Sequence, residues 1–281
     1  MFRVVVDEKL KAYDFGDAHP LGPIRVLRTY ENLRNLGLLD SADVEVVDAG
    51  APATLEQIRR VHTADYVECV QRAIPCLEHG LGTGDTPVFA GMHEATAAVC
   101  GATLRAAEGV ASGKAIHAVN IAGGLHHAMA NRGSGFCVYN DVAVAIEQLL
   151  ADGFERIAYI DVDAHHGDGT QSIFWDDPRV LTFSIHQNGK TLFPGTGFGH
   201  EIGGTNALGT AINLSVPPFT TDAEWLRAFD AVLPEVLQVF NPQIIISQHG
   251  CDSHEKDPLT SMQLTIDGQR TSYQMIHKWA H

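Results

Sequence analysis

Residues 157–170 begin as an apolar run and change abruptly into carboxylates and imidazoles. They read Ile-Ala-Tyr-Ile-Asp-Val-Asp-Ala-His-His-Gly-Asp-Gly-Thr, which places five ionisable groups within eight residues. Such groups are costly to remove from water unless they are paired or bind a metal. The segment therefore predicts a buried strand that ends in a reactive site. A strand end whose polar side chains only meet water is the less favoured alternative.

Side-chain alternation along this strand predicts how the polar groups are presented. Asp161, Asp163 and His165 would share one face while the chain stays extended. Gly167 and Gly169 would then free the backbone for a tight turn. Two oxygen donors and one nitrogen donor are therefore expected to converge.

The remainder of the chain alternates strand patterns with helix patterns. Beside the run that starts at Ile157, the expected strands cover residues 3–7, 44–48, 115–121, 180–185, 210–216 and 243–247. The expected helices cover residues 26–36, 54–60, 63–74, 92–109, 142–150, 168–175, 221–240 and 267–281. Two wholly apolar strands end in polar residues of the kind that bind metals. The pattern predicts a three-layer α/β protein with a mostly parallel central sheet, helices on both faces and the active site at the carboxyl ends of the strands.

Composition limits the class of protein. With 281 residues, 45% of them hydrophobic, the chain can bury a large core, and no linker divides it, so we expect a single domain over residues 1–281. No segment approaches the ~18 apolar residues of a membrane helix. The start, Met-Phe-Arg-Val-Val-Val-Asp, enters a strand pattern without a leader, which predicts a cytoplasmic protein. A net charge of −15 disfavours nucleic acid as a partner and tolerates cationic peptides.

The cysteines are spread along the chain and form no C-x-x-C pair. This spacing favours reduced thiols over a disulfide framework or a thiolate zinc site. The five residues are Cys69, Cys76, Cys100, Cys137 and Cys251.

Asp163 and His165, together with Asp252 behind the second apolar strand, would give a divalent metal three protein ligands and an open position. Catalytic zinc sites are built in this way, and an oxygen-rich set also accepts iron(II), manganese or cobalt. The reaction class that follows is metal-assisted hydrolysis, with an amide as the simplest substrate.

His126 and His127 follow a strand-like segment and the pair Gly123-Gly124. They are candidates for moving protons to and from water and the leaving amine. Adjacent histidines would point to different sides if the backbone were extended, and a single buried structural histidine is the alternative. Asp161 and Asp168 are the natural carboxylate partners that would orient the imidazoles.

Glycine-rich and polar motifs also carry a family resemblance. They are Gly123-Gly-Leu-His-His127, Gly135-Phe-Cys137, residues 160–169, Phe193-Pro-Gly-Thr-Gly197, Gly250-Cys-Asp-Ser253 and Asp257-Pro258. Together they resemble the zinc-dependent histone deacetylase family. The match extends over nearly the whole chain through the spacing of Asp14, His19-Pro20, Arg25, residues 62–66 and residues 84–89. Within the family the chain is most similar to bacterial acetoin-utilisation deacetylases, especially at residues 250–254.

The resemblance implies the arginase/deacetylase fold and hydrolysis of acetyl-lysine in proteins, with a role in acetoin or acetate metabolism. The implied partner is an acetylated protein or peptide, and the implied cofactors are Zn²⁺, with Fe²⁺ as an alternative, and K⁺. The implied metal ligands are Asp163, His165 and Asp252. The implied catalytic residues are His126 and His127 with the carboxylates Asp161 and Asp168.

Further roles are implied only by the resemblance. Phe136 and Phe193 match the aromatic walls of a lysine tunnel, Gly135 and Asp85 match the rim that holds the substrate, and Arg25 matches the gate of an acetate channel. The implied monovalent-cation site consists of Asp161, Asp163, His165, Ser184 and Ile185.

One departure concerns the carboxyl-terminal end. The family places an oxyanion-binding tyrosine in a glycine-rich segment after the third ligand, and this chain reaches His281 before such a segment. Tyr273 lies in a helical pattern and does not replace it. We therefore expect a deacetylase shortened at its carboxyl end, and loss of such a donor typically costs about 10²–10³ in rate.

Three alternatives stay open. A two-metal ureohydrolase would need additional carboxylates at the positions of Gly167 and Gly250, and this disfavours it. An amidohydrolase that acts on acetylpolyamines or other small amides would use the same residues. An inactive module that binds acetyl-lysine would fit the absence of the tyrosine.

Overall fold

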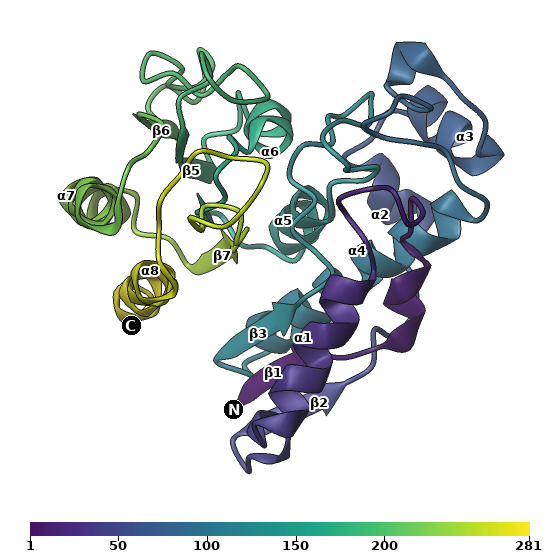
Figure 1. Ribbon diagram of the computed structural model, residues 1–281, viewed down its shortest axis with the longest axis horizontal. Coiled ribbons are helices and arrows are strands. Elements are labelled where there is room, and N and C mark those ends of the chain that lie inside the picture. The colour runs from purple at the N-terminus through teal and green to yellow at the C-terminus, as the bar shows by residue number, and fades with distance from the viewer. The chain divides into compact units, whose positions relative to one another are not determined.

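The computed structural model describes residues 1–281, and its contacts divide the chain into two compact units, Met1–Gly153 and Phe154–His281. Each unit contains one sheet whose strands are all parallel, together with helices (Figure 1). The predicted parallel α/β architecture is therefore confirmed, with its strands in two sheets. The single domain over residues 1–281 stays a prediction.

The first unit has the strand order β2-β1-β3. The strands are β1 (Phe2–Val5), β2 (Val44–Val47) and β3 (His117–Asn120). The helices are η1 (Glu8–Ala12), α1 (Ile24–Asn35), η2 (Leu38–Asp40), α2 (Leu55–Arg59), α3 (Ala64–Arg72), η3 (Leu77–His79), α4 (Met92–Ala111) and α5 (Asp141–Ala151). Helix α4 packs against β1, β3 and α5. Its buried side chains are mostly small, which lets the backbone of α4 come close to its neighbours.

The second unit has the strand order β6-β5-β4-β7. The strands are β4 (Ile157–Asp161), β5 (Val180–Gln187), β6 (Ala211–Val216) and β7 (Ile244–Gln248), and the helices are α6 (Asp168–Ile173), α7 (Asp222–Phe240) and α8 (Ile266–Trp279). Every residue of β4 and β5 is buried, as expected for parallel strands covered on both faces.

The core of the second unit joins one face of its sheet to α7 and α8. Ile160 of β4 and Phe183 of β5 belong to the same buried cluster as Trp225 and Phe229 of α7. The ring of Phe229 also contacts Trp279 of α8 at a centroid distance of 5.4 Å. Full burial of one such side chain contributes about 1.5–3 kcal/mol, so this cluster holds the sheet and both helices together.

The sequence patterns locate the elements to within a few residues, and the capping signals are present. Thr54 with Gln57, and Thr221 with Glu224, form the two-sided caps at the starts of α2 and α7.

One local prediction is wrong. Strand β4 ends at Asp161, and the chain bends through residues 163–165 instead of staying extended. The cause is that side-chain carboxylates accept nearby N–H groups: Asp161 Oδ1 accepts from Asp163 N at 3.1 Å, and Asp163 Oδ1 accepts from His165 N at 2.8 Å. Gly169 lies inside α6 and not in a turn.

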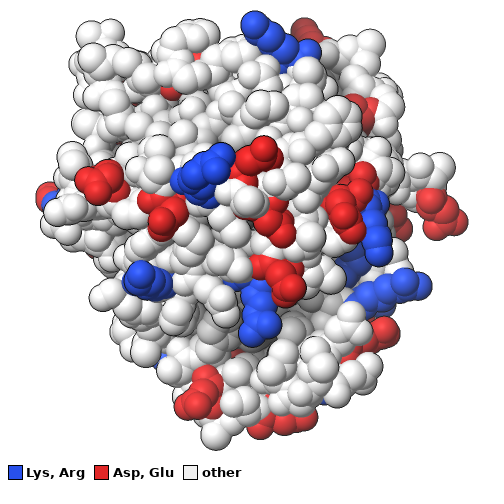
Figure 2. Space-filling view, turned by 60° about the vertical axis from the view of Figure 1, so that its left-hand side comes forward, with Lys and Arg blue, Asp and Glu red and all other residues white.

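No helix combines the length and the apolar character needed to cross a bilayer. On the face drawn in Figure 2, acidic side chains are interspersed with basic ones, and the basic side chains do not form a continuous patch.

Candidate metal and catalytic site

The predicted ligands Asp163, His165 and Asp252 lie together in the second unit. One potential ligand atom from each lies within 4.8 Å of the others. His165 Nδ1 is 3.1 Å from Asp163 Oδ1 and 2.6 Å from Asp252 Oδ2. The first two follow β4 and the third follows β7, and these strands are parallel neighbours, so their carboxyl ends meet at the same edge of the sheet. The expected convergence of two oxygen donors and one nitrogen donor is present.

The main chain and a neighbouring amide hold both carboxylates. Asp252 Oδ1 accepts the Ala164 N–H at 2.9 Å, which ties the loop after β7 to the loop after β4. Asp163 Oδ2 accepts from Gln248 Nε2 at 2.9 Å. Gln248 is the last residue of β7 and was not among the predicted site residues. The two polar residues that end a strand beginning Ile-Ile-Ile were the available signal.

Gly250 is required by the close approach of Asp163. A Cβ atom at position 250 would lie 1.9 Å from Asp163 Oδ2, well inside contact distance. The Gly250 N–H also donates to Gln248 Oε1 at 2.7 Å. A carboxylate at this position, as a two-metal ureohydrolase would need, has no space in this arrangement.

The electrostatics of the cluster favour an added positive charge. Burial by itself lowers the pKa of His165, but hydrogen bonds and charges from Asp163 and Asp252 outweigh it and raise that pKa to about 10. Burial and the negative charge of Asp163 raise the pKa of Asp252 to about 7, against the opposing effect of His165. Two largely buried carboxylates thus share one imidazole, and this donor set fits a divalent metal of the catalytic zinc type.

The residues implied for a monovalent cation surround the end of β4. Asp161 pairs in register with Ser184 of β5, and Ile185 follows on the same strand. Asp161 Oδ2 also accepts the Tyr159 hydroxyl at 2.6 Å, while the Ser184 hydroxyl lies 2.7 Å from His186 Nδ1. The K⁺ assignment stays a prediction.

Phe193 and Asp168 belong to the same unit as the ligands. The ring of Phe193 has its centroid 6.3 Å from that of His165, and 44% of the residue is exposed. Its loop is held by Glu201, whose carboxylate accepts the N–H groups of Gly197 and Phe198 at 3.0 Å. Asp168 is the buried first residue of α6, where the helix dipole favours a negative charge.

His126 and His127 lie in the first unit, both buried, with their Nε2 atoms 3.1 Å apart and their ring centroids 4.0 Å apart. The backbone is not extended here, because the chain turns at these residues, so the two adjacent rings lie together instead of on different sides. Asn140 holds this turn, since its Nδ2 donates to the carbonyl of His126 at 3.3 Å and to that of Ala128 at 3.1 Å.

Asp141 holds the glycine segment that precedes the histidines. Its carboxylate accepts the N–H of Leu125 at 2.8 Å, the N–H of Gly124 at 3.1 Å and the hydroxyl of Thr103 at 2.5 Å. Burial raises the pKa of Asp141, and these three hydrogen bonds oppose the rise. A Cβ atom at Gly123 would lie 2.4 Å from Asp141 Oδ2. Asp141 was not among the predicted site residues, although the polar pair Asn140-Asp141 before the apolar helix marked a helix start.

His62 supports the same region through hydrogen bonds to the segments that follow the histidines. Its Nδ1 donates to the Met129 carbonyl at 3.0 Å, and its Nε2 accepts the Asn140 N–H at 3.0 Å. Burial lowers the pKa of His62 to about 4, so the ring is neutral and can accept that hydrogen bond.

The predicted substrate-rim residues of the first unit, Asp85 and Gly135, are joined to each other by a hydrogen bond. Asp85 Oδ2 accepts the Gly135 N–H at 2.8 Å. A Cβ atom at Gly135, whose φ is +51°, would lie 2.4 Å from His127 Cδ2, so the loop passes close to the histidine ring. The carbonyl of Phe136 accepts the Tyr13 hydroxyl at 2.7 Å, and His19 contacts the Phe136 ring edge-on at 4.6 Å.

Arg25 is the second residue of α1 and lines a small cavity with Leu10, Tyr13, Pro23 and Ala122. Its role at an acetate channel stays a prediction. The two sets of functional residues belong to different units, so their convergence also stays a prediction.

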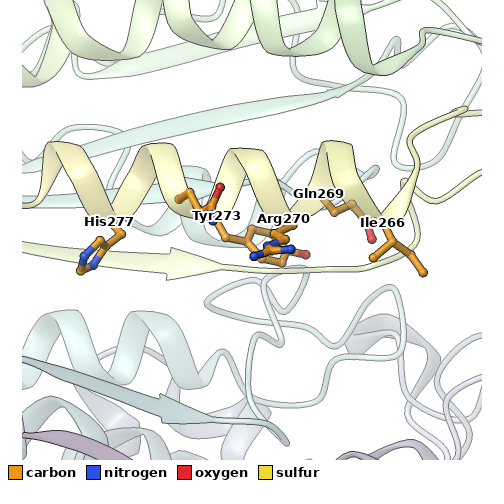
Figure 3. Close-up of a pocket in the computed structure, with 6 residues that line it drawn as sticks. Ile266, Gln269, Arg270, Tyr273 and His277 are labelled. Atoms are coloured by element: carbon orange, nitrogen blue, oxygen red, sulfur yellow. The ribbon is translucent and has the colours of Figure 1, made fainter.

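An open groove of about 410 Å³ runs along α8 (Figure 3). It is lined by Ile266, Gln269, Arg270, Tyr273, Gln274 and His277, and these include none of the predicted site residues. Gln269 nevertheless supports the ligand loop, because its Nε2 donates to the Cys251 carbonyl at 3.0 Å and to Ser253 Oγ at 2.9 Å, on either side of Asp252. Tyr273 lies within α8, as its helical pattern predicted.

Comparisons with known proteins agree with this geometry. Residues 19–281 match the histone deacetylase domain family. The chain is 44% identical over 278 residues to the acetoin utilization protein AcuC of Bacillus subtilis, a match that covers 96% of this chain and 71% of that protein. It is 38% identical over 269 residues to AcuC of Staphylococcus aureus (strain MRSA252), covering 93% of this chain and 68% of that protein.

Solved structures show the same relationship. A crystal structure of an HDAC homologue from Aquifex aeolicus matches with a TM-score of 0.90 at 32% identity, covering 99% of this chain and 76% of that chain. An HDAC homologue complexed with SAHA matches with a TM-score of 0.89 at the same identity. The predicted fold and family resemblance are confirmed, and the chain belongs to the histone deacetylase family.

Proposed function

We propose that this chain is a zinc-dependent lysine deacetylase that hydrolyses acetyl-lysine amides in proteins and acts in acetoin or acetate metabolism. The observation that carries the proposal is the cluster of Asp163, His165 and Asp252, held by the main chain at one end of a parallel sheet. Membership of the histone deacetylase family and similarity to AcuC support it. The proposed chemistry uses three groups of residues.

Asp163, His165 and Asp252 would hold the metal, with Zn²⁺ as the proposed ion and Fe²⁺ as the alternative. A bound divalent ion would supply Lewis-acid polarisation of the amide carbonyl and would make water more acidic. Gln248 and Gly250 keep the Asp163 carboxylate in place for this role. K⁺ is proposed at Asp161, Asp163, His165, Ser184 and Ile185, where it would offset the buried negative charge.

His126 and His127 would move the protons of the reaction. Their Nε2 atoms are 3.1 Å apart, so one ring donates a hydrogen bond and the other accepts it. A pair of this kind would accept a proton from the attacking water and return one to the departing amine. Asp161 and Asp168 are proposed as the carboxylates that orient the two rings.

Phe136 and Phe193 would bind the apolar stem of the lysine side chain. Aromatic rings provide apolar surface for a methylene chain. The Phe193 ring lies beside the proposed ligand His165, and the Phe136 ring contacts His19. Asp85, at the surface, would hold the substrate backbone while it also fixes the Gly135 N–H.

The test is deacetylation of an acetyl-lysine peptide by the zinc-loaded protein, with and without a hydroxamate inhibitor. Zinc-dependent turnover that the hydroxamate blocks is expected. His127→Ala should lower turnover by about 10²-fold or more with the metal retained, since proton transfer and metal binding are separate roles. The matched control is Asp230→Asn, which changes an exposed carboxylate of α7.

Two outcomes would contradict the proposal. Turnover of acetylated polyamines in preference to the peptide would favour a small-amide amidohydrolase. Tight peptide binding with no turnover in the presence of zinc would favour an acetyl-lysine-binding module.

A further inference from the structure

A second group of metal-type donors lies in the first unit. Cys69, Cys76 and His79 each offer one ligand atom, and these atoms all lie within 4.8 Å of one another. The two Sγ atoms are 3.1 Å apart. Both cysteines are free thiols, each partly buried. The spacing of seven residues argued against a thiolate site, but the fold brings the two sulfur atoms together.

A chain reversal after α3 creates this proximity. Helix α3 ends at Arg72, and Ala73 adopts a left-handed conformation with a φ of +49°. Residues 76 and 81 then close a short loop, because the Cys76 N–H donates to the Leu81 carbonyl at 2.9 Å and the Leu81 N–H donates to the Cys76 carbonyl at 3.1 Å. This closed loop carries Cys76 and His79 back to the last turn of α3, where Cys69 lies.

His79 is held in the tautomer that a metal requires. Its Nδ1 lies 2.6 Å from the Asn131 carbonyl, which only accepts hydrogen bonds, so Nδ1 carries the proton and Nε2 is left as a ligand atom. Histidine ligands are commonly oriented by such a carbonyl contact. Nε2 also lies 3.9 Å from Asp65 Oδ2, and the Asp65 side chain is 71% exposed. A carboxylate at this side adds negative charge where a cation would bind.

We propose that Cys69, Cys76 and His79 form a zinc site, separate from Asp163, His165 and Asp252, with Asp65 or water as the fourth ligand. Two sulfur donors and one imidazole are a donor set that zinc prefers, and tetrahedral zinc accommodates a fourth ligand on the exposed side. The proposal does not depend on deacetylase activity.

The site would stabilise the predicted substrate rim. The carbonyl of His79 accepts the Gly133 N–H at 2.9 Å, two residues before Gly135. The loop that follows Gly80 leads to Asp85, which binds Gly135 through its carboxylate. A metal that fixes His79 would therefore restrain both segments that carry the rim, one on each side of the Asp85–Gly135 hydrogen bond.

A disulfide between Cys69 and Cys76 is the competing outcome. Oxidation of two thiols whose Sγ atoms lie 3.1 Å apart would form it, and the reducing conditions of the test below keep both thiols free. Zinc would instead displace the thiol protons, as thiolate sites generally require.

Cobalt(II) substitution under reducing conditions provides the test. The ligands Asp163, His165 and Asp252 contain no sulfur, so a sulfur-to-cobalt charge-transfer band in the near ultraviolet reports only on the thiol site. The full chain should show this band, and Asp252→Ala should keep it. Cys69→Ser and Cys76→Ser should each lose it. Cys100→Ala, which removes a buried thiol of α4, is the matched control and should retain it.

Metal counting provides a second readout. Zinc content should fall from about two ions per chain to about one in Cys76→Ser, and also to about one in Asp252→Ala. No charge-transfer band in the folded chain, or zinc content unchanged by Cys76→Ser, would overturn the site. A Cys69–Cys76 disulfide in protein purified with excess zinc would overturn it as well. Loss of zinc in Asp252→Ala alone bears on the deacetylase proposal and not on this one.

Discussion

In the first unit the histidine turn depends on a separate carboxylate, because Asp141 accepts the N–H groups of Gly124 and Leu125 while His126 and His127 follow. In the second unit Asp163 and Asp252, the proposed ligands, themselves accept the N–H groups of the loop after β4. In the first unit, therefore, the residue that holds the backbone differs from the residues proposed for the chemistry. In the second unit, the proposed metal ligands also hold the backbone. Substitutions should have different consequences in the two units.

The largest effect is expected from Asp252→Ala in a Cys76→Ser background, where only the proposed catalytic site would bind zinc. The substitution removes a ligand and also the acceptor of the Ala164 N–H. Bound zinc should fall from about one ion per chain to near zero, because too few anchors remain. Elemental analysis after dialysis checks this, with Asp230→Asn as the control. Unchanged zinc would remove the ligand assignment.

Gly250→Ala should weaken zinc binding almost as much as the removal of a ligand does, although it leaves all three ligand residues unchanged. The added Cβ would lie 1.9 Å from Asp163 Oδ2 and would push the carboxylate away. Disturbed ligand orientation typically lowers metal affinity about 10–100-fold. Gly199→Ala is the matched control, since its Cβ would meet only Asn213 O at 4.0 Å. Titration with zinc measures the difference in affinity. Equal zinc affinities in the two variants would contradict the prediction and would mean that the loop after β7 shifts to make room for the added Cβ.

Asp141→Asn should lower the stability of the chain without affecting zinc binding, and so distinguish the roles of carboxylates in the two units. The Asp141 carboxylate accepts three hydrogen bonds. In the variant the NH₂ group of the amide would take the place of one carboxylate oxygen, so two donors would face each other and a hydrogen bond would be lost. A buried group left in this state costs about 3 kcal/mol in the free energy of unfolding. Denaturant unfolding of the variant and of Asp152→Asn, an exposed change at the end of α5, measures this. Zinc affinity should be unchanged, and its loss would contradict the division of roles.

The smallest effect concerns pH and His62. Its pKa is lowered by burial from 6.5 to about 4 in the folded chain, so below pH 6.5 the unfolded chain binds a proton that the folded chain does not. Stability contributed by neutral His62 should therefore be complete above pH 6.5 and decline as the pH falls below that value, by about 2 kcal/mol at pH 5. Unfolding curves of the chain and of His62→Asn should converge over this range. A constant difference between them would contradict the prediction.

Much of the fold could be predicted because strand and helix patterns are local. The apolar run at Ile157 becomes β4, and the Thr221 and Glu224 signal becomes the cap of α7. The ligand cluster was also predictable, since two apolar strands of a parallel sheet end at the same edge. The bend after Asp161 was missed because side-chain oxygens there compete with the strand for N–H groups.

The sequence by itself determined the family motifs, the parallel α/β class and the residue types at the proposed metal site, because these depend on periodicity and on residues close together in the chain. Only the tertiary structure showed that Gly250 packs against Asp163, that Asp141 holds Gly124 and Leu125, and that Cys69 meets Cys76. The physical reason is that such contacts depend on strand pairing, on helix position and on the direction of a turn. A difference of one residue in any of these would move the side chains several ångströms apart.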